Sequence, residues 1–447
     1  MSESPLLERA RKLDAADPLR AFRERFALPR DERGNLLVYL CGHSLGLQPL
    51  AAREAVAQEL DDWARLGVRG HEHARRPWIH YHETLAPGLQ ALTGTQPGEV
   101  VAMSSLTVDL HLMLSSFFRP QGERRKILIE AGAFPSDRHA VVSHLEWHGL
   151  SARDALIELA PAEGEDLVPQ SAIEECLERE GSQIALVLWP GVQFRTGQSF
   201  DIARVVRAAQ RAGCVAGLDL AHSIGNTPLQ LHASNADFAV WCSYKYLNAG
   251  PGAIGGCFVH ERHAAPSKHR LAGWWGHEVA TRFEMKPGFR AASGAAGWQV
   301  SNPPVLSSAP LLSSLALFTE AGIERLREKS IALTGLLEEA VQPLADVQII
   351  TPRRAEERGC QLSLRIGARG SDIANVARRS GSAAAGAAGT AGDGVRGRRV
   401  FEWLDRRSVV CDWRSPDIIR VAPVPLYNRF EDVALFAQRL SQALQEA

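Results

Sequence analysis

The sequence predicts an α/β protein in which a large domain, built on a mostly parallel sheet, precedes a smaller α+β domain. Two observations carry this prediction. Between about Leu85 and Val259, short apolar runs alternate with segments of helical spacing, which is typical of a parallel sheet covered by helices on both faces. From about Ser308 the pattern changes to one long amphipathic segment followed by three further apolar runs. A chain of 447 residues is long enough for both domains.

Five apolar runs of the large domain are expected to form buried strands. Two segments between them, 138–150 and 201–213, have helical spacing, and the second ends at a glycine, a common helix stop signal. The expected strands are "KILIE" (126–130), "SQIALVLWPGV" (182–192), "VAGLDL" (215–220), "DFAVWCS" (237–243) and "IGGCFVHE" (254–261). Ligands of such sheets bind beyond the carboxyl ends of the strands, so the residues that follow these runs are the first candidates for a site.

The predicted domain boundaries follow the change in pattern. Residues 1–35 are expected to form a polar, peripheral N-terminal segment, residues 36–307 the large domain, and residues 308–447 the small C-terminal domain. The small domain contains the amphipathic segment 311–344 and the apolar runs "VQIITP", "CQLSLRI" and "IIRVAPVPLYN". An Ala/Gly-rich stretch near 380–399 has almost no large apolar side chain, and we expect it to be a flexible surface insertion.

Composition excludes several classes of protein. The formal net charge of -1 does not favour a nucleic-acid partner. The seven cysteines are widely spread without C-x-x-C spacing, which favours reduced thiols in the cytoplasm over a disulfide framework. No apolar run approaches the roughly 18 residues of a membrane helix, and the charged N-terminus has no signal-peptide core. We therefore expect a cytoplasmic protein that does not bind a membrane.

Two motifs are weaker than they look. "GPGAIG", Gly250 to Gly255, matches a dinucleotide-binding pattern but leads into a predicted strand instead of a helix, so we interpret it as a glycine-rich turn. The histidines of "GHEHARRPWIHYHE" lack H-E-x-x-H spacing and have no complementary thiol or carboxylate cluster. We therefore expect no metal site.

Lys245 lies between two tyrosines just beyond the predicted strand 237–243. A structural lysine in such a place would extend to solvent or pair with a carboxylate. The neighbouring strand ends favour a chemical role: Asp219 and His222 follow one run, and an aromatic and a carboxylate follow another in "AFPSD". The hydroxyl groups and amides of "SSLTVDLH" begin a predicted helix, where a phosphate can bind.

A lysine amine, a carboxylate and a phosphate-binding turn suit pyridoxal 5'-phosphate. In enzymes that use this cofactor, the lysine forms a Schiff base and the carboxylate keeps the pyridine nitrogen protonated, so that the ring becomes an electron sink. An aromatic side chain can stack on the ring. The residues thus point to a pyridoxal-phosphate enzyme.

The sequence resembles the kynureninase family, which are pyridoxal-phosphate hydrolases of the aminotransferase-like superfamily. The resemblance extends from about Leu36 to Phe430 and excludes only the Ala/Gly-rich insertion. It is carried by long motifs in the order of the family, among them "YLCGHSLGLQP", "GHEHARRPWI", "SSLTVDLHLML", "AFPSD", "DLAHSIGN", "WCSYKYLNAGPG", "GWWGHE", "VSNPP" and "RVAPVPLYN".

The resemblance implies a fold and an activity. The fold is that of the pyridoxal-phosphate aminotransferase-like enzymes, and the protein would be a homodimer. The reaction would be hydrolysis of the β–γ carbon bond of L-3-hydroxykynurenine or L-kynurenine, which gives 3-hydroxyanthranilate or anthranilate together with L-alanine. That reaction belongs to tryptophan catabolism by the kynurenine pathway and can supply pyridine nucleotide biosynthesis. We favour 3-hydroxykynurenine as the better substrate, because His71, Ser301 and Asn302 resemble the branch that prefers it.

The resemblance also implies roles for particular residues. Lys245 would form the Schiff base, Tyr244 would donate a proton, and Asp219 would pair with the pyridine nitrogen. The implied cofactor-binding residues are Leu106, Thr107, Phe134, Pro135, Ser136, Asp137, Asp219, His222, Tyr244, Lys245, Trp274 and Asn302, some of them contributed by a partner subunit. The implied substrate-binding residues are Ser44, His71, Asn302 and Arg420, with Arg420 holding the substrate carboxylate. Pro190 stands where the family often has a small hydroxyl residue, which implies one contact fewer.

Two alternatives stay open. A pyridoxal-phosphate lyase of the cysteine-desulfurase type would need a mobile, reactive thiol, and Cys360 is the best candidate, although its apolar surroundings suggest an inert core residue. A binding protein without activity would be expected to lack Lys245 or Asp219, and both are present.

Overall fold

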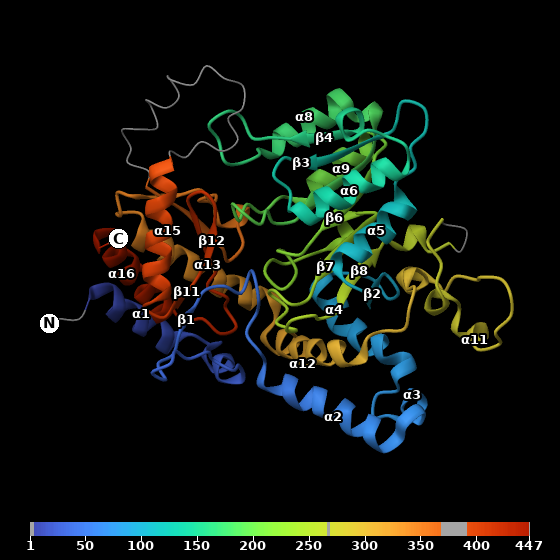
Figure 1. Cartoon of the computed structure of the whole chain (residues 1–447), viewed down its shortest axis with the longest axis horizontal. Helices are drawn as coiled ribbons and strands as arrows, with labels where there is room; N and C mark the ends of the chain where they lie inside the picture. The colour runs from blue at the N-terminus through green and yellow to red at the C-terminus, as the bar shows by residue number, and fades with distance from the viewer. Residues whose placement is uncertain (1–3, 266–268, 368–390, 447) are drawn as a thin grey trace.

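A seven-stranded sheet with strand order β2-β8-β7-β6-β5-β3-β4 forms the centre of the larger body (Figure 1). The computed structural model describes residues 4–265, 269–367 and 391–446. Strands β4, β3, β5, β6 and β7 run parallel, whereas β8 is antiparallel to both of its neighbours. The strands are β2 (Val100–Met103), β3 (Lys126–Glu130), β4 (Leu156–Leu159), β5 (Ile184–Pro190), β6 (Val215–Asp219), β7 (Phe238–Cys242) and β8 (Gly255–Val259). The predicted fold class is confirmed.

Helices cover both faces of this sheet, as the buried runs predict. Within β5, Leu186 and Leu188 pack into one apolar cluster, whereas Val187 and Trp189 pack into the other. One face is covered by α5 (Leu106–Phe117) and α6 (Pro135–Trp147), and the opposite face by α4 (Ala86–Thr93), α8 (Gln170–Glu180), α9 (Ile202–Arg211) and α12 (Val305–Ala321). Outside these layers, α2 (Leu50–Leu66) lies along α12, and α3 (Gly70–His73) follows it. The remaining short helices are α7 (Ala152–Ala155), α10 (Leu231–Ser234) and α11 (Val279–Arg282).

The smaller body, on the left of Figure 1, contains an antiparallel sheet of order β12-β13-β10-β9. Its apolar core joins this sheet to helices from both ends of the chain. These elements are α1 (Pro5–Ala16), α13 (Ile323–Val341), β9 (Val347–Ile349), β10 (Leu362–Ile366), α15 (Ala391–Asp405), β12 (Asp412–Arg414), β13 (Ile418–Val421) and α16 (Phe430–Glu446). Among the described residues, no single helix is long and apolar enough to cross a membrane, although α12 and α13, bent by 81°, would pass that test together.

Two elements near the N-terminus belong to the smaller body. Ala10 of α1 is fully buried in its core, and β1 (Val38–Tyr39) pairs in parallel with β11 (Val409–Val410). Helix α12 instead contributes Leu311 and Phe318 to the core of the large body. We therefore place the division of the chain near Gly322, between α12 and α13, and not at residue 308. We assign α1 and β1 to the smaller body, whereas Leu19, Phe22 and Phe26 pack into the core of the large body.

The structure describes only part of the predicted Ala/Gly-rich stretch near 380–399. Residues 380–390 of the predicted stretch lie outside the described residues. Residues 391–399 form the beginning of α15, so the expectation of an unordered segment is corrected there. The physical reason lies beyond the stretch itself, because Val400, Trp403 and Leu404 are buried in the core of the smaller body and anchor the helix that residues 391–399 begin.

Candidate active site

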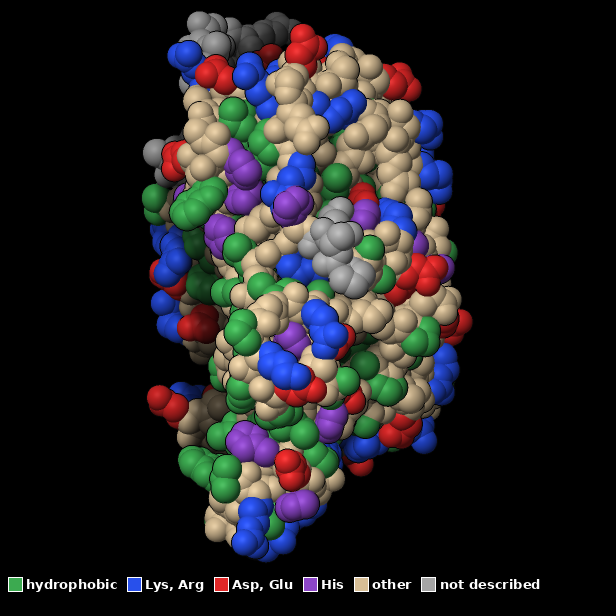
Figure 2. All heavy atoms as spheres, turned by 90° about the vertical axis from the view of Figure 1, so that its right-hand side faces the viewer, with side chains coloured by type: hydrophobic (Ala, Val, Ile, Leu, Met, Phe, Trp, Pro, Cys, Tyr) green, Lys and Arg blue, Asp and Glu red, His purple; other side chains and the backbone are tan. Residues whose placement is uncertain are grey.

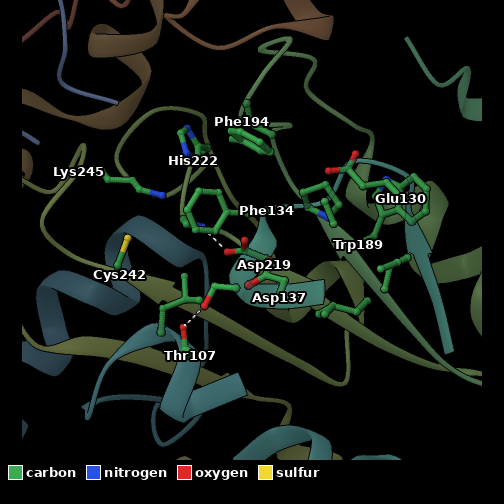
Figure 3. A pocket seen from close by; sticks show the side chains of 18 of the residues that line it. Thr107, Glu130, Phe134, Asp137, Trp189, Phe194, Asp219, His222, Cys242 and Lys245 are labelled. Carbon is green, nitrogen blue, oxygen red and sulfur yellow. Dashed lines mark hydrogen bonds between the residues drawn. The ribbon is translucent and has the colours of Figure 1, made fainter. Parts of the chain in front are cut away.

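A cavity of about 230 Å³ opens at the carboxyl ends of β3, β5, β6 and β7 (Figure 3). This is the edge of the sheet that the sequence indicates. Residues from strand ends, from the first turns of α5 and α6, and from the loop after β7 meet there. The lining is Ser105, Leu106, Thr107, Ile129, Glu130, Ala133, Phe134, Ser136, Asp137, Leu188, Trp189, Pro190, Val192, Phe194, Asp219, Ala221, His222, Cys242, Tyr244, Lys245 and Ala253.

Lys245 projects into this cavity from the loop that follows β7. The residue is only 9% exposed, and its Nζ lies 5.7 Å from the ring centroid of Phe134 and 5.8 Å from that of Tyr244. Within the part of the chain that the structure describes, the amine makes no hydrogen bond or ion pair. A structural lysine would reach solvent or a carboxylate, so this placement favours an amine that is kept available for a ligand.

Two carboxyl groups enter the cavity beside each other. Asp219 ends β6, and its Oδ1 accepts a hydrogen bond of 2.8 Å from the backbone N–H of Ala221, which fixes the orientation of the carboxylate. Asp137 lies in the first turn of α6 and has a buried Oδ1 without a partner among the described residues. Burial and the adjacent Asp219 raise the pKa of Asp137 well above its usual range. The pair is therefore suited to a cationic ligand.

The first turns of two helices meet at one wall of the cavity. The residue before α5, Ser105, has extended backbone and makes no side-chain cap, and the first N–H groups of a helix have no partner within it. The Thr107 hydroxyl lies 2.8 Å from the Ser136 hydroxyl in the first turn of α6 (Figure 3). Hydroxyl groups and free amides at positive helix ends can bind a phosphate.

An aromatic ring and a neutral imidazole complete the predicted set. Phe134 is 40% exposed, so its ring is open to a ligand, and its edge contacts the ring of Phe194 at a centroid distance of 5.3 Å. His222 is buried and has an Nδ1 without a partner among the described residues. Burial and the charges of Lys245 and Arg420 lower the pKa of His222 well below its usual range, so the ring is neutral.

The sequence did not single out several residues of the cavity. Glu130 ends β3 inside it, and burial raises the pKa of this carboxyl group to about 8. Phe194 and Cys242 also line it, and Cys242 is drawn below Lys245 in Figure 3. The signal was present for Glu130, because an acidic residue closing the apolar run "KILIE" must lie at a strand end. Pro190 does line the cavity, and it is the register partner of Asp219.

Two of the predicted substrate-binding residues lie next to the cavity without lining it. Ser44 occupies a turn in which its N–H donates to the carbonyl of Cys41, and the N–H of Gly46 in the same loop donates to the carbonyl of Tyr244 at 2.9 Å. Arg420 of β13 is only 1% exposed, and its Cζ lies 5.9 Å from the ring centroid of Phe194. The loop and the arginine thus approach the site from the smaller body.

Three other predicted residues gather elsewhere. His71, Trp274 and Asn302 line a second cavity, of about 790 Å³, formed by α2, α3 and the segments around residues 274–283 and 302–306. None of the three lines the cavity that holds Lys245. Figure 2 shows the right-hand face of the molecule, where hydrophobic side chains lie among histidines at the lower end. Within one chain, the predicted site is therefore divided between two cavities.

Cys360 and two histidines of the "GHEHARRPWIHYHE" motif make contacts within the chain. Cys360 is 1% exposed, burial raises its pKa to about 12, and it does not line the cavity that contains Lys245. Its backbone N–H donates to the Asn226 side chain. His80 pairs with Glu83 at 2.8 Å, and His71 contacts the ring of Trp78.

The cavity around Lys245 fits pyridoxal phosphate. A free amine suits the aldehyde, the Asp137–Asp219 pair suits a pyridinium cation, and the open face of Phe134 suits the ring. Oδ1 of Asp137 and Nδ1 of His222 are polar atoms without a partner in the described part of the chain, and such a group would satisfy them. The joined first turns at Thr107 and Ser136 suit its phosphate.

Comparisons with known proteins agree with this geometry. A family model described as the kynureninase C-terminal domain matches residues 326–381 and 390–440. A protein named kynureninase from Xanthomonas axonopodis pv. citri (strain 306) is 52% identical over 433 residues, which are 96% of each chain. One from Xanthomonas euvesicatoria pv. vesicatoria (strain 85-10) is 52% identical over 440 residues, covering 97% of this chain and 98% of the other.

Solved structures share the fold at much lower identity. C-DES with glycine covalently linked to its PLP cofactor is 17% identical with a TM-score of 0.74, covering 91% of this chain and 96% of that chain. The apo cysteine desulfurase from Thermococcus onnurineus NA1 is 16% identical with a TM-score of 0.71 and covers both chains completely. At such identities the likeness concerns the fold alone, so the cysteine-desulfurase alternative has only a distant fold relationship in its favour.

Proposed function

The chain belongs to the kynureninase family, and we infer that it is a pyridoxal-phosphate-dependent hydrolase that cleaves kynurenine in tryptophan catabolism. The single observation that carries this inference from the geometry is Lys245. Its amine is buried, has no partner among the described residues, and shares a cavity with Asp219. The reaction takes up one water molecule and releases L-alanine together with the aryl carboxylate. When it is bound, pyridoxal phosphate supplies an electron sink for the bonds that break at the substrate's carbon atoms.

We propose that this chain's residues hold the cofactor as follows. Asp219 would pair with the pyridine nitrogen, with Asp137 beside it, and Phe134 would stack on the ring. The amides of Leu106 and Thr107, with the Ser136 hydroxyl, would hold the phosphate. His222 would remain neutral in the pocket, and Pro135, which begins α6 without a backbone N–H, would fix the turn that presents Phe134 and Ser136.

Proton movements are assigned to the two residues after β7. The Lys245 Nζ would remove and return protons at the substrate's carbon atoms, since it is a buried amine beside the aromatic rings of Phe134 and Tyr244. Burial raises the pKa of the Tyr244 hydroxyl, so this group stays protonated at neutral pH and can donate its proton. Arg420 would bind the substrate carboxylate, and Ser44 would lie along the side that receives the substrate.

The test of this function is an absorbance spectrum of the purified protein with pyridoxal phosphate, followed by addition of kynurenine with alanine release monitored. A Schiff-base band that changes on addition of substrate, together with alanine, is expected. A protein that binds no pyridoxal phosphate and releases no alanine would refute the function.

The buried, free cysteines support a location in the reducing cytoplasm.

We propose a homodimer in which His71, Trp274 and Asn302 complete the site of the partner subunit. The second cavity supports this, because exposed apolar side chains surround it: Trp63 is 59% exposed, Val68 80% and Phe283 54%. Large exposed apolar residues that cluster on one face mark an interaction surface. A two-fold axis would bring each second cavity to the first cavity of the other copy.

Mixing two inactive variants tests this arrangement. Lys245→Ala and Asn302→Ala dimers, unfolded and reassembled together, form heterodimers in which one of the two sites has both native residues. Random pairing should therefore restore about one quarter of the wild-type activity. Each variant reassembled alone is the matched control. No recovery in the mixture, with heterodimers demonstrated by differential tags, would refute the shared site.

We further propose a preference for 3-hydroxykynurenine over kynurenine. Polar groups such as His71, Ser301 and Asn302 would bond the ring hydroxyl, and a substrate without that hydroxyl would leave them unpaired. The ratio of kcat/KM for the two substrates tests the preference. His71→Phe should lower the ratio of kcat/KM for 3-hydroxykynurenine to kcat/KM for kynurenine. A clear kynurenine preference in the unaltered protein would refute the proposal.

A further inference from the structure

Asp412 lies directly opposite Arg420 in the small sheet. Strands β12 and β13 are antiparallel, and Asp412 and Arg420 are register partners. Both side chains therefore lie on the same face, at the separation that suits a cross-strand ion pair. The register makes this neighbourhood a property of the sheet and not of a flexible loop.

The carboxylate of Asp412 holds one edge of the guanidinium. Its Oδ2 lies 2.6 Å from both Nε and Nη2 of Arg420. On the other side, Nη1 of Arg420 donates to the carbonyl of Phe194 at 2.6 Å. Asp412 and Phe194 thus use one N–H on each guanidinium nitrogen, which leaves one further N–H on Nη1 and one on Nη2. These two N–H groups remain for a ligand, and arginine commonly binds a carboxylate with two such donors.

The surroundings keep Asp412 charged and in place. Arg414 donates from Nε to the same Oδ2 at 2.9 Å, and Nε2 of the buried His43 lies 4.0 Å away. Burial opposes ionisation of Asp412, but His43 and Arg420 outweigh it and hold the pKa of this carboxyl group below its usual range. The side chain of Arg420 is 1% exposed, so without Asp412 a buried cation would lose its charged partner.

Phe194 connects this pair to the cavity around Lys245. The Phe194 ring lines that cavity, whereas its carbonyl accepts from Arg420 and, at 3.0 Å, from Gln361 Nε2 of the smaller body. The position of Arg420 relative to the cavity is therefore determined from two sides, by Asp412 and by the backbone at Phe194. Only Asp412 contributes a side chain that can be replaced without altering the cavity wall.

We propose that Asp412 is a positioning residue for substrate recognition, which orients the guanidinium of Arg420 so that its remaining N–H groups meet the substrate's carboxylate. Asp412 itself does not contact the substrate. This proposal rests on the proposed function, because it presumes an amino-acid substrate bound by Arg420. A carboxylate that serves only the stability of the fold is the competing explanation, and the two differ in which ligands lose affinity.

The experiment compares the holoenzyme with Asp412→Asn, which keeps the size of the side chain and removes its charge. We expect KM for kynurenine to rise about tenfold or more while kcat changes little, because an interaction made equally before and during the reaction is lost. The decarboxylated amine of kynurenine, titrated by its change in cofactor absorbance, should bind to both proteins with the same affinity. Asp412→Glu, which retains the charge, should recover part of the lost affinity for kynurenine.

Asp166→Asn is the matched control. Asp166, in the loop between β4 and α8 of the large body, forms an ion pair of 2.6 Å with Arg365 of β10, and neither residue lines the cavity. The Asp166→Asn variant should leave KM for kynurenine unchanged. If Asp412→Asn weakens the amine and kynurenine equally, or leaves KM unaltered, the proposal is overturned. If Asp412→Asn does not fold, the same comparison of kynurenine with the amine in Asp412→Glu decides, since equal losses for both ligands contradict positioning. Failure of the unaltered protein to cleave kynurenine would instead refute the proposed function.

Discussion

The hydroxyl groups of Thr107 and Ser136 lie 2.8 Å apart, although 29 residues separate them in the chain. Thr107 belongs to the first turn of α5 and Ser136 to the first turn of α6. Both helices begin at the carboxyl edge of the sheet, so their positive ends and their hydroxyl groups converge on one wall of the cavity. This contact is the geometric basis for the proposed phosphate site.

Replacing Thr107 by Val should weaken cofactor binding. The variant keeps the shape of the side chain and removes a hydroxyl group that would bond a charged phosphate, a contact worth about 1.5–3 kcal/mol. The dissociation constant for pyridoxal phosphate, measured by absorbance titration of the cofactor-free protein, should rise about tenfold or more. Ser115→Ala is the control, because this α5 hydroxyl donates to the carbonyl of His111 and does not line the cavity. An unchanged affinity in Thr107→Val would contradict the phosphate assignment.

Replacing Lys245 by Arg should abolish turnover and leave the fold intact. Arginine is a long side chain that can also reach the rings of Phe134 and Tyr244, but it remains protonated and forms no Schiff base. The absorbance band of the Schiff base should be absent, and alanine release should fall to background. Lys286→Arg, an exposed lysine that pairs with Glu284, is the control. A Lys245→Arg protein that still turned over would exclude this lysine as the attachment point.

Glu130 should make the cofactor-free protein less stable as the pH rises. Burial raises the folded-state pKa of Glu130 to about 8, above the value of about 4.5 for an ordinary glutamate. A carboxyl group whose pKa is raised in the folded state contributes its full stabilisation of the fold at pH values below its unfolded-state pKa. This contribution is lost as the pH rises through the folded-state pKa. The Tm of Glu130→Gln minus the Tm of the unaltered protein should therefore increase between pH 6 and pH 9, by on the order of several degrees.

The control for that series is Glu174→Gln, which removes an exposed carboxylate that pairs with Arg204. The hydrogen bond from Arg204 is the main cause that lowers the pKa of Glu174 in the folded protein. The contribution of Glu174 to the free energy of unfolding is therefore already complete above pH 5. The difference in Tm between Glu174→Gln and the unaltered protein should not vary between pH 6 and pH 9. A flat difference for Glu130→Gln as well would show that Glu130 does not titrate in this range.

The thiols should be unreactive in the folded protein. All seven cysteines are free and buried, and burial raises the pKa of each. A thiol-reactive disulfide reagent should modify them only after denaturation, and Cys360→Ala should cleave kynurenine within about twofold of the unaltered rate. Rapid modification of one native thiol with parallel loss of activity would favour the sulfur chemistry of the desulfurase alternative.

Much of the site could be predicted because it follows strand ends. Lys245, Asp219 and the segment from Phe134 to Asp137 each come directly after an apolar run, and parallel strands bring their carboxyl ends to one edge. Glu130 was missed although it closes the apolar run "KILIE" and so marked a strand end. Phe194 was missed because nothing local distinguishes such a pocket residue from an ordinary loop residue until neighbouring strands are paired.

The sequence by itself determined the α/β class, the strand-end positions of Lys245 and Asp219, and the family motifs, because these depend on local periodicity and on short contiguous segments. Only the tertiary structure decided that α1 packs on α16, that residues 391–399 begin a helix, and that His71, Trp274 and Asn302 lie in a second cavity. It also brought Asp412 opposite Arg420. These relationships depend on the free energy gained by burying apolar surfaces that are distant in the chain, which no local pattern contains.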